Sequence, residues 1–105
     1  MSEHRYDCVL TLALPAALEE EVLGHLQAHP EWVNGFSVVA AEGFGAGAPL
    51  ETTIEQVRGR ARRRLVTLLL DSQNVERLLH SLRGQFRSPH MAYWVTPLTS
   101  FGRFA

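Results

Sequence analysis

The sequence predicts an α+β domain of the ferredoxin-like type, with the order strand, helix, strand, strand, helix, strand. In this fold a four-stranded antiparallel sheet carries both helices on one face. Segments with strand periodicity and segments with helical periodicity follow one another in that order. The 105 residues suffice for a single domain, 1–105, and 46% hydrophobic with 20% charged residues is typical of a folded globular chain.

The first strand and the first helix are predicted between residues 6 and 29. Apolar or aromatic residues occupy alternate positions of the strand, at Tyr6, Cys8, Leu10, Leu12 and Leu14. Pro15 ends the strand and opens the helix, because its missing N–H would be unpaired in a first turn anyway. Apolar residues then recur at helical spacing, at Leu18, Val22, Leu23 and Leu26. His29-Pro30 ends the helix.

The second strand is predicted at residues 36–41, and a long segment, residues 42–59, follows it. Three glycines in five positions, Gly43, Gly45 and Gly47, favour a flexible, exposed loop at its start. Thr52 and Glu55 have the spacing of a helix capping box. A segment of this length in a small domain is typically functional or disordered.

The third strand is predicted at residues 62–70, and Asp71-Ser72 then offers an N-cap for the second helix. The apolar stripe of this helix consists of Val75, Leu78, Leu79, Leu82 and Phe86, and the helix is predicted to end at Arg83-Gly84. Residues 91–96 form the predicted fourth strand, which Pro97 stops.

The predicted sheet is apolar on both faces, although the helices cover only one of them. Along the first strand, Val9 and Ala13 face away from Leu10 and Leu12. A face of this kind exposes more contiguous apolar surface than monomeric soluble proteins usually tolerate. The pattern therefore predicts a homo-oligomer.

Charge and cysteine content narrow the classes of function and compartment. Ten basic and eleven acidic residues give a net charge of −1, so we expect no nucleic-acid partner and no binding to anionic membranes. The single cysteine, Cys8, excludes an intrachain disulfide and a CxxC motif. No segment has the pattern of a signal peptide or the length of a membrane span, so a cytoplasmic location without membrane insertion is expected.

A cluster of arginines is the strongest local signal. All ten basic residues are arginine, and five lie within seven positions, at Arg58, Arg60, Arg62, Arg63 and Arg64. The planar guanidinium suits bidentate binding of carboxylate or phosphate, which favours an anion site or a docking site for a partner. A solvated basic edge, balanced by nearby glutamates, is the alternative interpretation. Arg87 and Arg103 lie near the ends of the last strand and would add to the same cleft if subunits meet there.

Several segments resemble the nitrogen regulatory PII signal-transduction proteins of the PII/CutA superfamily. Residues 35–39 (Gly-Phe-Ser-Val-Val) and 42–45 (Glu-Gly-Phe-Gly) resemble the second strand and the base of the T-loop in that family. Residues 55–60 and 93–97 are similar to a group of small uncharacterised PII-like proteins that are often encoded beside heavy-metal efflux pumps. The resemblance covers nearly the whole chain in layout.

The resemblance implies a homotrimer with ligand clefts between subunits and a T-loop-like segment, 42–59, that changes shape on ligand binding. The implied partner is a membrane transporter or an efflux-pump component, and the implied ligand is a small anion such as an adenine nucleotide. The implied ligand-binding residues are Gly43, Phe44, Gly45, Arg58, Arg60, Arg62, Arg64, Arg87 and Arg103. The chain differs from PII proteins in having no lysine, and residues 85–90 lack their glycine-rich phosphate loop.

A second hypothesis is a metal-binding protein that resembles the CutA copper-tolerance trimers. A divalent metal would then bind to residues among His4, Cys8, His25 and His29, of which the last two are one helical turn apart. A helix C-terminus also favours histidine through its dipole, and Cys8 fits a buried thiol. A third possibility is a trimeric adaptor without a small ligand. No catalytic triad or dyad has a recognisable local signature, so we expect that the protein is not an enzyme.

Overall fold

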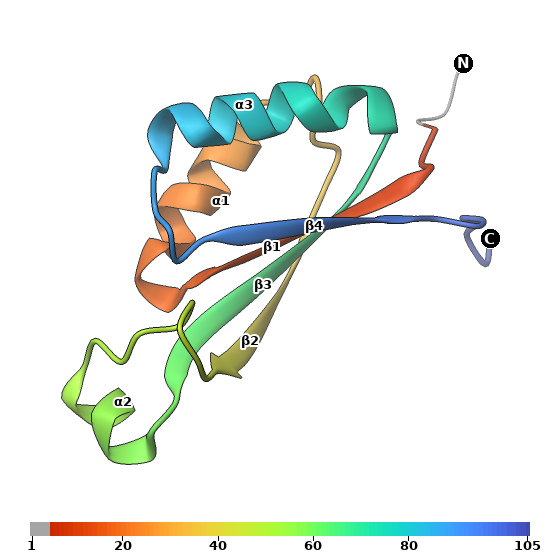
Figure 1. Cartoon of the computed structure of the whole chain (residues 1–105). Helices are drawn as coiled ribbons and strands as arrows, with labels where there is room; N and C mark the ends of the chain where they lie inside the picture. The colour runs from red at the N-terminus through yellow and green to blue at the C-terminus, as the bar shows by residue number, and fades with distance from the viewer. Residues whose placement is uncertain (1–4) are drawn as a thin grey trace.

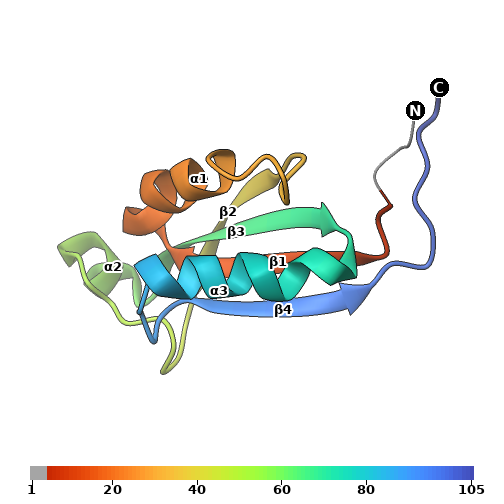
Figure 2. The same ribbon diagram turned by 90° about the horizontal axis from the view of Figure 1, so that it is seen from above.

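The computed structural model describes residues 5–105 and has a four-stranded antiparallel sheet with two helices on one face (Figures 1 and 2). The strands pair in the order β2-β3-β1-β4. The elements are β1 (Cys8–Pro15), α1 (Glu19–Gln27), β2 (Ser37–Gly43), α2 (Thr53–Arg58), β3 (Ala61–Leu70), α3 (Val75–Gln85) and β4 (Ala92–Pro97). Short 3-10 turns at Ala16–Leu18 and Ser72–Asn74 precede α1 and α3. The predicted α+β, ferredoxin-like arrangement is confirmed.

The hydrophobic core lies between the sheet and the helices α1 and α3. The antiparallel register places Leu10 opposite Leu68 and Leu12 opposite Val66, so both central strands send these side chains to the same face. The two helices contribute their predicted apolar stripes, and the buried helical residues are Val22, Leu26, Val75, Leu78, Leu79 and Leu82. Burial of each leucine stabilises the fold by about 1.5–3 kcal/mol.

The opposite face of the sheet carries no helix (Figure 1). The strand registers place Val39 opposite Leu65 and Trp94 opposite Thr11 on this face, and both Val39 and Trp94 are about half exposed. The prediction that both faces of the sheet carry apolar side chains is therefore confirmed.

Several element boundaries differ by one or two residues from the sequence-based expectation. Strand β2 continues to Gly43, because its pairing with β3 extends until Gly43 lies opposite Ala61. Helix α3 continues through Gly84 to Gln85. Within residues 5–105, no helix is both long and apolar enough to cross a membrane.

Candidate ligand site at the base of the 42–59 segment

The 42–59 segment contains the short helix α2, which the predicted capping box starts. The Thr52 hydroxyl accepts a hydrogen bond from the Glu55 N–H at 3.1 Å, and the Glu55 carboxylate accepts from the Thr52 N–H at 2.9 Å. Gly59 ends the helix in the left-handed conformation, with φ of 75°. Local sequence thus determines both ends of α2.

The Glu55 side chain ties α2 to the beginning of β3. It is buried, and its carboxylate also accepts from the backbone N–H groups of Glu51 and Arg62. Donation from Arg62, Glu51 and Thr52 holds the pKa of Glu55 at about 2, below its ordinary value of 4.5. A charged Glu55 therefore fixes the fold of the second half of the segment.

Arg63 and Gly43 form the base on which the segment rests. A Cβ atom at position 43 would lie 3.0 Å from the Ala48 Cβ and 3.0 Å from the Arg63 Cγ, so glycine permits this close approach. Arg63 is buried, and its Nη2 donates to the His90 carbonyl oxygen at 2.9 Å. Arg63 thus links β3 to the turn between α3 and β4.

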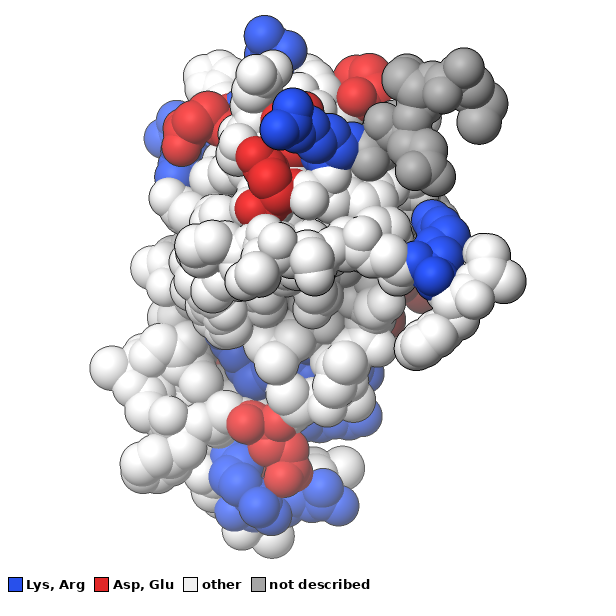
Figure 3. Space-filling model, turned by 90° about the vertical axis from the view of Figure 1, so that its right-hand side faces the viewer, with Lys and Arg blue, Asp and Glu red and all other residues white. Residues whose placement is uncertain are grey.

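Glu42 joins the start of the segment to its end. Its carboxylate lies 3.6 Å from Arg58 Nη1 and 3.2 Å from Arg60 Nη1. Figure 3 shows basic and acidic side chains gathered at the lower end of the molecule, which carries α2 in Figure 1. We call this arrangement of Glu42, Arg58 and Arg60 the arginine clamp. The clamp closes the segment into a loop.

The remaining arginines of the cluster have different environments. Arg64 is held against α1, because its Nε donates to the Glu19 carboxylate at 2.7 Å. Arg62 is exposed, and among residues 5–105 no carboxylate lies within ion-pair distance of its side chain. Of the cluster, Arg58, Arg60 and Arg62 are the arginines at the surface of the segment's base.

The other predicted ligand residues are spread over the fold. Phe44 is exposed and Gly45, with φ of 122°, lies in the turn after β2, so both stay close to Gly43. Arg87 lies beside a pocket between α3 and β4. Arg103 packs over the Phe101 ring at the opposite end of the sheet, where β3 ends. Within one chain, Arg103 is therefore remote from the arginine clamp.

The histidines considered as metal ligands bind polar side chains of α3 and of the loop after α1. His25 Nδ1 lies 2.8 Å from Gln85 Oε1, and His25 Nε2 lies 2.8 Å from Ser81 Oγ. His29 Nε2 lies 3.4 Å from the same Ser81 oxygen, and its Nδ1 lies 3.0 Å from the Glu31 carboxylate. The equal i, i+4 spacing of two pairs was the sequence signal for this contact: His25 near the end of α1 with His29 just after that helix, and Ser81 with Gln85 on α3.

The metal hypothesis finds no support in the described part of the chain. Cys8 is buried, its thiol donates to the Leu70 carbonyl oxygen at 3.4 Å, and burial raises its pKa. Within residues 5–105, no three His, Cys, Asp or Glu side chains are grouped so that they could hold an ion. His4, the remaining candidate ligand, lies outside the described residues.

Solved structures with this fold include PII-like proteins. CPII, a nitrogen regulatory PII-like protein from Thiomonas intermedia K12, was solved bound to ADP, AMP and bicarbonate; it is 18% identical over 94% of this chain and 96% of its own, with a TM-score of 0.70. A protein from Thermus thermophilus that is described as PII-like and signalling is 16% identical over 88% of this chain and 86% of its own, with a TM-score of 0.61. The PII-like fold that the sequence resemblance implied is confirmed.

Residues 5–105 match the family described as protein of unknown function DUF3240, and the chain belongs to that family. A DUF3240 family protein from Shewanella baltica OS155 is 18% identical over 96% of this chain and 99% of its own, with a TM-score of 0.75. No curated protein matches the sequence.

Proposed function

We propose that this chain is a non-enzymatic, PII-like regulatory protein that binds a small anion and signals through residues 42–59. The favoured ligand is an adenine nucleotide, bound in clefts between the subunits of a homotrimer. The responding partner would be a membrane transporter or an efflux-pump component. The observation that carries the proposal is the arginine clamp, in which Glu42 holds two arginines at the base of the segment.

The clamp suits a switch because its ion pairs are exposed. Ion pairs between exposed side chains contribute only about 0.2–1 kcal/mol each, so a phosphate or carboxylate of a ligand can replace Glu42. Arginine binds such anions with two parallel hydrogen bonds. A ligand that binds Arg58 and Arg60 better when Glu42 is released favours a conformation of the segment in which the Glu42 ion pairs are broken.

The choice of ligand rests on the similar structures and on the charge of the site. The structure of CPII holds ADP, AMP and bicarbonate, all of which are anions. Since this chain has no lysine, arginine must supply any cationic contact to phosphate. Arg62, which is exposed beside the clamp, would add a third guanidinium.

The apolar sheet face supports self-association. Val39 and Trp94 are large exposed apolar side chains on this face, and contact with other copies would remove them from water. In a trimer, each clamp would be repeated by symmetry, and residues of a neighbouring copy would complete the cleft.

Isothermal titration calorimetry with ADP, AMP, ATP and bicarbonate tests the proposal. We expect micromolar binding of at least one nucleotide, and a loss of affinity of about tenfold in Arg60→Ala, as expected for one charge-assisted contact. Arg77→Ala, an exposed arginine on α3, serves as the matched control and should bind normally. Native mass spectrometry of the same samples should show a trimer.

The proposal fails if none of these anions binds to the wild-type protein at millimolar concentration. It also fails if Arg60→Ala and Arg62→Ala bind the nucleotide as well as Arg77→Ala does. A monomer in native mass spectrometry would overturn the placement of the ligand between subunits.

A further inference from the structure

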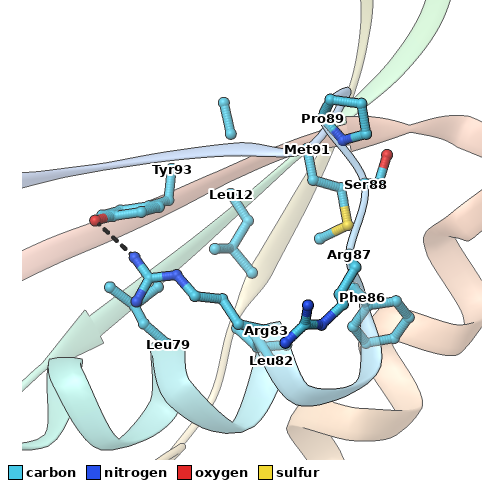
Figure 4. A pocket seen from close by; sticks show the side chains of 11 residues that line it. Leu12, Leu79, Leu82, Arg83, Phe86, Arg87, Ser88, Pro89, Met91 and Tyr93 are labelled. Atoms are coloured by element: carbon cyan, nitrogen blue, oxygen red, sulfur yellow. Dashed lines mark hydrogen bonds between the residues drawn. The ribbon is translucent and has the colours of Figure 1, made fainter.

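A pocket of about 590 Å³ lies between α3 and β4, away from the arginine clamp (Figure 4). Its volume falls within the range of roughly 300–1,000 Å³ that is usual for small-molecule sites. The apolar part of the lining comes from β1, α3, β4 and the turn that follows α3, and its large side chains are Leu12, Leu79, Leu82, Phe86, Met91 and Tyr93. No residue of the 42–59 segment lines it.

The pocket exists because β4 is an edge strand that the helices cover incompletely. The register places Tyr93 opposite Leu12, so Tyr93 is on the same face as the core. Leu12 is buried, whereas Tyr93 and its neighbour on this face, Val95, remain 43% and 41% exposed. A strip of apolar surface on the helical side of β4 is therefore open to solvent.

Arginine supplies all the formal charge in the lining of the pocket. Arg83 donates from Nη2 to the Tyr93 hydroxyl at 3.0 Å, and its guanidinium lies 5.4 Å from the centre of the Tyr93 ring. Figure 4 shows the Arg83 side chain reaching from α3 to Tyr93 on β4, and Arg87 beside Phe86. Within residues 5–105, neither arginine forms an ion pair with a carboxylate, and no Asp or Glu lines the pocket.

The helix dipole explains only part of this arrangement. Basic residues are favoured in the last turn of a helix, where Arg83 lies. The dipole explains neither the apolar pocket beside these residues nor the contact of Arg83 with Tyr93 across the pocket. An apolar surface beside two cations without carboxylate partners is instead complementary to a molecule with an apolar body and one negative charge.

We propose that this pocket binds a small amphiphilic monoanion, an alkyl or aryl carboxylate. Its apolar body would contact Leu12, Leu79 and Met91, and its carboxylate would accept hydrogen bonds from Arg83 and Arg87. The Ser88 hydroxyl, which also lines the pocket, offers a further polar group near the turn. The pocket contains no residue of the arginine clamp, and Arg87 is the residue that it shares with the ligand set implied by the PII resemblance.

Calorimetry with sodium decanoate below its micellar concentration tests the proposal. Decanol and decyltrimethylammonium carry a neutral and a positive head on an alkyl chain one carbon longer than that of decanoate, and we expect both to bind at least tenfold more weakly in spite of the longer chain. Shortening the carboxylate by one methylene should weaken binding about fourfold, the value for removing one buried CH₂. Equal binding of the three head groups, or no binding of decanoate, would overturn the proposal.

Variants of the two arginines locate the site. Arg87→Gln should weaken decanoate binding by about three- to tenfold, and the double variant Arg83→Gln/Arg87→Gln by more than about tenfold. Arg77→Gln, on the same helix but outside the pocket, should bind as the wild type does. All three arginines are exposed, and circular dichroism verifies that the variants are folded. Wild-type affinity in the folded double variant would refute the assignment.

Discussion

Replacing Glu42 by glutamine is expected to tighten the binding of ADP. The Glu42 carboxylate occupies the two guanidinium groups that the proposed ligand needs, so the ligand must first displace it. Glutamine has nearly the same shape but no charge, and it therefore leaves the base of the segment intact while releasing Arg58 and Arg60. If Glu42 served only to stabilise the fold of the segment, its replacement would instead weaken ADP binding, because the ligand site depends on that fold.

The size of the effect follows from the geometry of the two ion pairs. The N–O distances are 3.6 and 3.2 Å, and the side chains are 60% exposed for Arg58, 56% for Arg60 and 39% for Glu42. Pairs as exposed as these contribute about 0.5 kcal/mol each, so releasing both should favour the ligand by about 1 kcal/mol. This corresponds to a dissociation constant about fivefold lower, with an upper limit of about thirtyfold.

Calorimetric titration of wild type and Glu42→Gln with ADP measures this difference. The matched control is Glu19→Gln, because Glu19 forms an ion pair with Arg64 at 2.7 Å outside the 42–59 segment. The difference should shrink in 1 M salt, where the screening length falls to about 3 Å. Equal or weaker binding of ADP by Glu42→Gln, with Glu19→Gln unchanged, would refute competition at the clamp.

Two further changes test the fold of the segment. Because the pKa of Glu55 is lowered from 4.5 to about 2, its hold on α2 is complete above pH 4.5 and is lost as the pH falls toward 2. The hydrogen-exchange rate of the Thr52 amide, corrected for its intrinsic pH dependence, should therefore rise in acid. In Glu55→Gln the same amide should exchange faster already at pH 7. Protection of the Thr52 amide that does not change with pH would contradict this prediction. Gly59→Ala places an alanine at φ of 75°, which costs about 1 kcal/mol and should raise exchange of the residue-59 amide about fivefold. Gly35→Ala, at a glycine without positive φ and with open space around it, should leave that amide unchanged.

The sequence predicts the sheet and the core well because their periodicity is local. The alternation of β1 and the stripe of α3 each specify a buried face without knowledge of the other element. The capping box at Thr52 and Glu55 is likewise a local signal, and the structure contains it. The end of β2 is less predictable, because the strand continues to Gly43 only as long as β3 offers partners.

Contacts between distant elements could not be predicted in this way. Alternation along β3 implies that Arg63 faces away from Arg62 and Arg64, but it does not identify what each guanidinium meets. Arg63 binds the His90 carbonyl oxygen after α3, and Arg64 binds Glu19 on α1. Both partners are brought close only by the packing of helices on the sheet.

The strength of these contacts determines which arginines can bind an anionic ligand. Arg63 is buried under the segment and Arg64 is fixed against α1, so an anion would have to break well-formed contacts to bind either of them. Arg58 and Arg60 hold an exposed carboxylate whose replacement costs little, and Arg62 faces solvent. A ligand can compete only where the existing contact is weak. The arginine cluster therefore narrows, as a candidate anion site, to Arg58, Arg60 and Arg62.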